Sequence, residues 1–65
     1  MKLWLILYVT NGVVGGSWGP LPYDMTECLK RADEGRAMFK ANEKTKDWEP
    51  VCEYRVTRPN LGDKR

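Results

Sequence analysis

The chain opens with Met1-Lys2-Leu3-Trp4-Leu5-Ile6-Leu7-Tyr8-Val9 and continues with Thr10-Asn11-Gly12-Val13-Val14-Gly15-Gly16-Ser17-Trp18-Gly19. One lysine, a compact apolar run and a tail of small residues are the parts of a secretory signal peptide. In that interpretation the apolar run forms a helix, and cleavage after Ser17 releases a mature chain that begins at Trp18. The pattern predicts an export signal over residues 1–17 and a protein that works in the periplasm or outside the cell.

Two other interpretations of this segment stay open. As an uncleaved anchor, residues 3–19 would form a helix of about 25 Å, against a hydrocarbon core of roughly 30 Å. Gly12 and Gly16 have the spacing for close helix contact, but the central Asn11 and the glycines weaken such a helix. Membrane contact would then be confined to residues 1–19, with the C-terminus outside the cytoplasm. As a buried strand of a cytosolic protein, Leu3 to Val9 has enough β-branched and aromatic residues.

Size, charge and residue usage exclude several classes of function. The 65 residues carry a formal net charge of +2 and include no histidine. Lys2 is the only charged residue before Trp18, so the remainder has ten basic and nine acidic residues. That balance gives no long-range attraction for nucleic acid. We find no catalytic motif, and we expect no enzyme activity, no metal and no cofactor.

The middle of the chain predicts one helix after a stiff spacer. Prolines at positions 20 and 22 keep residues 18–23 extended. Asp24 can accept hydrogen bonds from the first turn of a helix, with Glu27 three residues on. Apolar residues at three- and four-residue spacing then predict an amphipathic helix from Met25 to about Ala41. Gly35 falls on that stripe and weakens the helix. Either it allows another backbone to approach closely or it is a tolerated defect.

The later part of the chain predicts a short strand. Residues 51–57 alternate, with Cys52, Tyr54 and Val56 on one face, between prolines at positions 50 and 59. Cys28 lies on the apolar stripe of the helix, so packing the helix on the strand brings Cys28 and Cys52 together. The expected fold is a small α+β domain over residues 24–59, one helix on a strand or hairpin with a Cys28–Cys52 disulfide, followed by a flexible tail over residues 60–65.

Two tryptophans are candidates for contact with a partner. Trp48 precedes Pro50 in the connector between helix and strand, where it can cover one end of the core or anchor a partner protein. Trp18 stands at the start of the proposed mature chain. We expect these two side chains to be the possible partner contacts, with the covering role favoured for Trp48.

Residues 13–28, from Val13 to Cys28, resemble the start of small uncharacterised exported proteins of bacteria and their phages. Residues 51–55, followed by Arg58-Pro59, resemble their second cysteine strand. The resemblance implies export and a cysteine pair, and it carries no activity. We therefore expect a small exported, non-catalytic binding or accessory protein. The alternative is a single-pass subunit anchored in the inner membrane by an uncleaved N-terminal helix.

Overall fold

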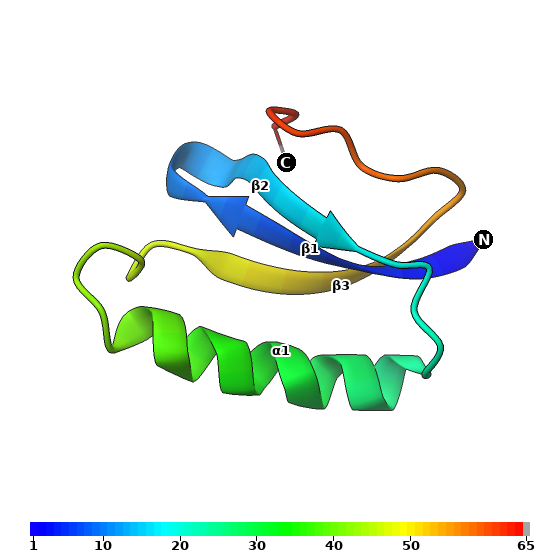
Figure 1. The fold of residues 1–65 in the computed structure, drawn as a ribbon, viewed down its shortest axis with the longest axis horizontal. Helices are drawn as coiled ribbons and strands as arrows, with labels where there is room; N and C mark the ends of the chain where they lie inside the picture. Colours follow the sequence, from blue (N-terminus) through cyan, green and yellow to red (C-terminus); the bar gives the residue numbers. More distant parts are fainter. Residues whose placement is uncertain (65) are drawn as a thin grey trace.

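A computed structural model describes residues 1–64 as a three-stranded antiparallel sheet with one helix packed on one face (Figure 1). In chain order the elements are β1 (Lys2–Val9), a 3-10 turn (Thr10–Gly12), β2 (Val13–Trp18), α1 (Met25–Lys40) and β3 (Glu49–Arg55). The strand order is β2-β1-β3, so β1 is the central strand. The α+β class and the helix that starts at Met25 are as predicted.

The predicted N-terminal helix is wrong, because residues 2–18 form the hairpin of β1 and β2. Asn11 and Gly12 have φ angles of 72° and 73°, the left-handed conformation that reverses a chain between antiparallel strands. Val9 pairs directly with Val13 across this turn. The interpretation of Leu3 to Val9 as a buried strand is thus confirmed for its structure, and its cytosolic location stays a prediction.

The two faces of β1 contribute to two packed layers. Leu5 pairs in register with Cys52 of β3, on the face covered by α1. Trp4, Ile6 and Tyr8 lie on the opposite face, where they form a buried cluster with Val14. Because side chains alternate along a strand, a strand covered on both sides is apolar throughout.

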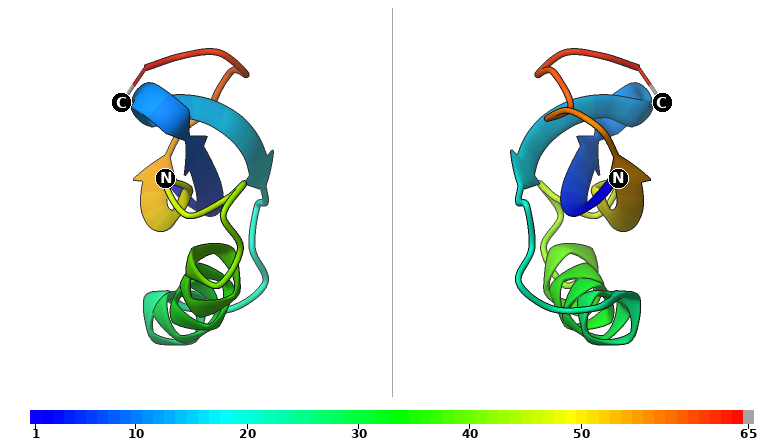
Figure 2. Two further views of the ribbon diagram at one scale, coloured as in Figure 1. Left: turned by 90° about the vertical axis from the view of Figure 1, so that its left-hand side faces the viewer. Right: turned by 90° about the vertical axis from the view of Figure 1, so that its right-hand side faces the viewer.

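The chain after β3, residues 56–64, covers the face of the sheet that α1 leaves free (Figure 2). The guanidinium of Arg58 lies 5.0 Å from the ring centroid of Trp4. Val14 donates its N–H to Asp63 O at 2.7 Å, and Gly62 donates to Val14 O at 2.9 Å. The segment expected to be a flexible tail is therefore hydrogen-bonded to β2 through residues 62–63, and residue 65 lies outside the described residues.

Helix α1 begins as its sequence indicates. Asp24 Oδ1 accepts a hydrogen bond from the N–H of Glu27 at 3.0 Å, while the Glu27 carboxylate accepts from Arg31 Nε at 3.2 Å. The helix ends at Lys40, within one residue of the prediction. No helix in residues 1–64 has the length and apolar character needed to cross a bilayer.

Strand β3 begins and ends two residues earlier than predicted, so Pro50 lies inside it. A proline is tolerated there because β3 is an edge strand, whose outer side needs no ladder hydrogen bond. The carbonyl of Pro50 accepts a hydrogen bond from Arg36 of α1 at 3.0 Å. This bond ties the middle of the helix to the start of the strand.

Candidate binding cleft

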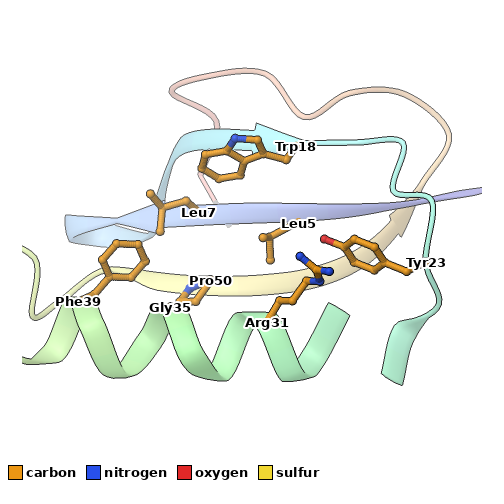
Figure 3. Close-up of a pocket in the computed structure, with 8 residues that line it drawn as sticks. All are labelled: Leu5, Leu7, Trp18, Tyr23, Arg31, Gly35, Phe39 and Pro50. Atoms are coloured by element: carbon orange, nitrogen blue, oxygen red, sulfur yellow. The ribbon is translucent and has the colours of Figure 1, made fainter. Parts of the chain in front are cut away.

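An apolar cleft of about 340 Å³ opens between α1 and the β2 side of the sheet (Figure 3). Helix α1 packs mainly on β3, so the same face of the sheet is less covered toward β2 (Figure 2). The side chains that line the cleft come from all three strands, the helix and the segment before it: Leu5, Leu7, Trp18, Tyr23, Arg31, Gly35, Phe39 and Pro50.

The pairing of the strands explains the floor and one wall. Leu5 and Leu7 are two residues apart on β1 and point to the same face. Trp18 lies directly opposite Leu5 on β2, and Gly16 lies opposite Leu7. The indole of Trp18 therefore stands beside the leucines and lies over Gly16, where an added Cβ would be 3.2 Å from the ring. About half of the Trp18 surface (53%) is exposed.

Helix α1 forms the opposite wall, with a gap at Gly35. A Cβ at this position would lie 3.8 Å from the Phe39 ring and 4.0 Å from the Pro50 ring, both ordinary contacts. No backbone atom of another element lies within 4 Å of this added Cβ, so close approach of another backbone does not require the glycine. Its effect is to leave the middle of the cleft open.

Arg31 carries the only formal charge among the lining side chains. Its guanidinium lies 4.6 Å from the ring centroid of Tyr23, and its Nε donates to Glu27. The lining includes no carboxylate, histidine, thiol or serine. Within residues 1–64 no group of three or more His, Cys, Asp or Glu side chains could hold a metal. The cleft offers an apolar surface with one positioned cation.

The predicted disulfide is confirmed: Cys28 of α1 is bonded to Cys52 of β3. Cys28 is fully buried. Because this bond fixes the helix over β3, it also fixes the wall of the cleft relative to its floor. Neither described cysteine is a free thiol.

The two tryptophans chosen from the sequence occupy different places. Trp18 lines the cleft. Trp48 packs its ring against Phe39, a lining residue of the cleft, with centroids 5.5 Å apart, and its covering role over the end of the core stays a prediction. Contact of either tryptophan with a partner stays a prediction.

A polar cluster that the sequence did not suggest lies on the other face of the sheet. The Tyr8 hydroxyl donates to Glu53 Oε1 at 3.2 Å, and Arg55 Nε donates to Glu53 Oε2 at 3.1 Å. Burial, followed by the negative charge of Glu53, raises the pKa of Tyr8 above its ordinary 10.0. The hydrogen bond from Arg55 to Glu53 raises the pKa of Arg55. These groups satisfy one another and leave no open site.

Comparison with known protein families, curated proteins and solved structures finds no match. The resemblance to small exported two-cysteine proteins therefore stays a prediction.

Proposed function

We propose that this protein is a small, non-catalytic binding or accessory protein of an exported location, periplasmic or extracellular, and that its partner binds in the cleft. The observation that carries the proposal is the open apolar cleft beside Trp18, held in shape by the Cys28–Cys52 bond. Apolar concave sites with few polar groups are typical of ligand binding, and disulfides persist in oxidising compartments. Apart from the Tyr23 hydroxyl, the lining side chains offer no acid–base group or nucleophile for a reaction.

A protein that uses this cleft must retain residues 1–17. Leu5 and Leu7 form the floor, and cleavage after Ser17 would remove β1 and every residue of β2 except Trp18. A cleaved leader over residues 1–17 and the cleft therefore exclude each other in one molecule. The proposal takes the retained chain as the binding form.

Intact-mass measurement on protein recovered from its natural compartment tests two points together: whether residues 1–17 are retained, and whether the compartment is oxidising. We expect the full chain of 7.5 kDa, lighter by about 2 Da than after reduction, because a disulfide has lost two hydrogens. An N-terminus at Trp18, or two thiols that react with an alkylating reagent before reduction, would contradict the proposal.

Native mass spectrometry of the same material tests the cleft. We expect a bound molecule on the natural chain and none on Gly35→Leu, because the leucine side chain would extend from α1 into the open space. Glu34→Leu adds the same side chain at the neighbouring exposed position and should keep the bound molecule. Equal occupancy in both variants would rule out the cleft as the binding site.

A further inference from the structure

We infer that the ligand of the cleft is a small apolar carboxylate, with its hydrocarbon body against Leu5, Leu7 and Trp18 and its carboxylate on Arg31. This inference rests on the proposed function, because it names the ligand class of the same cleft. It follows from the way Arg31 is held, from the single charge of the lining, and from the volume.

The guanidinium of Arg31 is held on two sides. Its Nε donates to Glu27 Oε2 at 3.2 Å, and Tyr23 lies against its face at 4.6 Å. Figure 3 shows the group rising from α1 toward Leu5 and Tyr23. Within residues 1–64 the two terminal nitrogens, Nη1 and Nη2, make no hydrogen bond that competes with a ligand. Two neighbouring N–H groups in a fixed plane match the two oxygens of a carboxylate.

The expected negative charge of the ligand follows from the charge of the lining side chains. Arg31 is the only formally charged side chain there, so an ammonium group would meet a like charge, and a neutral alcohol would gain only an ordinary hydrogen bond. Arg31 is already paired with Glu27, but both side chains are substantially exposed, at 57% and 42%. Exposed pairs of this kind are weak. A second carboxylate can therefore share the guanidinium.

The volume and the walls define the rest of the ligand. At about 30 Å³ for a group of the size of water or methylene, the cleft of about 340 Å³ holds roughly eleven such groups. Apart from the Tyr23 hydroxyl and the Trp18 indole N–H, the leucine, proline and aromatic side chains of the lining offer no hydrogen bond to a polar ligand body, which would lose most of its hydrogen bonds to water. Stable protein–protein contacts need about 1,000 Å² of buried surface, far more than one cleft of this size provides. A single small molecule such as an eight-carbon fatty acid fits these limits.

Titration of the full, disulfide-bonded chain with octanoate, octanol and octylammonium tests the inference. The probes share one apolar body and differ in charge. Binding is followed by the indole N–H signals of the three tryptophans in a nitrogen–proton correlation spectrum. We expect octanoate to shift the Trp18 signal saturably and to bind about three- to fivefold more tightly than the other two probes, because a hydrogen bond between ions is stronger than a neutral one but the guanidinium of Arg31 is substantially exposed.

Two variants assign the charge effect to one residue. Arg31→Gln removes the cation and should bring octanoate to the affinity of octanol. Lys30→Gln removes the neighbouring exposed cation, which does not line the cleft, and should leave octanoate binding unchanged. Unfolding curves of both variants, taken beside the natural chain, show whether the fold is intact.

Several results would overturn the inference. Equal affinity for octanoate and octanol, unchanged binding by Arg31→Gln, or octanoate shifts away from Trp18 would each refute a carboxylate at Arg31. Dimers that dissociate on Gly35→Leu substitution would make a second copy of the chain the occupant. A failure of the proposed function itself appears separately, as free thiols or a Trp18 N-terminus in the intact mass.

Discussion

Reduction of the Cys28–Cys52 bond should remove a large part of the stability of this protein. The bond closes a loop with a sequence separation of 24 residues, for which the chain-entropy model gives about 3–4 kcal/mol. A chain of 65 residues, at about 0.05–0.15 kcal/mol per residue, has a total free energy of unfolding of about 3–10 kcal/mol. The crosslink is therefore expected to supply between a third and all of it.

The position of the disulfide indicates that its contribution lies at the upper end of this range of the free energy of unfolding. It joins α1 directly to β3, and the helix buries only Cys28 and Ala32. Arg36 of α1 also donates a hydrogen bond to the Pro50 carbonyl of β3. With so little apolar surface of α1 buried, few contacts offset the entropy that the reduced chain regains.

Urea unfolding of the oxidised and reduced chains, followed by circular dichroism, measures the effect. With an m-value of about 1–1.5 kcal/mol/M, we expect the midpoint to fall by about 2–4 M on reduction. Cys28→Ala with Cys52→Ala separates the crosslink from packing, because the reduced chain keeps both sulfur atoms and the double variant does not. A change below about 1 kcal/mol at equal m-value would refute the reasoning.

Three further outcomes are expected. Gly35→Ala should raise the free energy of unfolding by about 0.5–1 kcal/mol, because α1 gains helix propensity and the added methyl meets only ordinary contacts; thermal unfolding measures this, and a loss would contradict it. Gly15→Ala should lower the free energy of unfolding by about 1–3 kcal/mol, because the new Cβ overlaps the Val9 side chain. An unchanged free energy of unfolding in urea would contradict this overlap. Because burial and Glu53 raise the pKa of Tyr8 in the folded chain above 10.0, its contribution to stability is complete below about pH 10 and is lost as the pH rises through the folded-state pKa. Tyr8→Phe should therefore lose less stability than the natural chain as the pH rises from about 10 through the folded-state pKa of Tyr8, and parallel curves of urea midpoint against pH would exclude this coupling.

The helix, the later strand and the disulfide could be predicted because their signals are local. Asp24 caps the helix through an atom three residues from its donor, and Cys28 and Cys52 each lie on the apolar side of a periodic segment. Packing the apolar face of the helix on the apolar face of the strand is enough to bring the two cysteines together. The predicted strand begins two residues too late because it treats Pro50 as the residue before the strand, a rule that does not hold on an edge strand.

The N-terminal strand could not be separated from a leader by composition. A strand covered on both faces is apolar at every position, so Leu3 to Val9 shows no alternation between apolar and polar residues, and periodicity alone does not distinguish such a run from a helix. The signal that was available is the pair Asn11-Gly12 between two apolar runs, a strong local indication of a hairpin. The interpretation of this segment as a membrane anchor treats the same two residues as weak points of a helix.

The cleft could not be predicted because it depends on register. The pairing of β1 with β2 shifts by one residue between Leu7 and Tyr8, which leaves Gly15 as an extra residue in β2. Without this bulge, continuing the pairing from Val9–Val13 would move Trp18 by one position along β1, to the face away from α1. Trp18 reaches the cleft only because of a local irregularity that the sequence pattern does not reveal.

Because β1 is the central strand, both the sheet and the cleft depend on whether residues 1–17 are retained. Strands β2 and β3 do not pair with each other, since each pairs with β1. A chain cut after Ser17 would therefore keep α1, β3 and the Cys28–Cys52 bond but no sheet, and it would lack the buried cluster of Trp4, Ile6, Tyr8 and Val14. Without a second strand, β3 would have no partner for its backbone groups. The cleaved and retained chains would thus differ in fold as well as in length, and only the retained chain has a floor for the cleft.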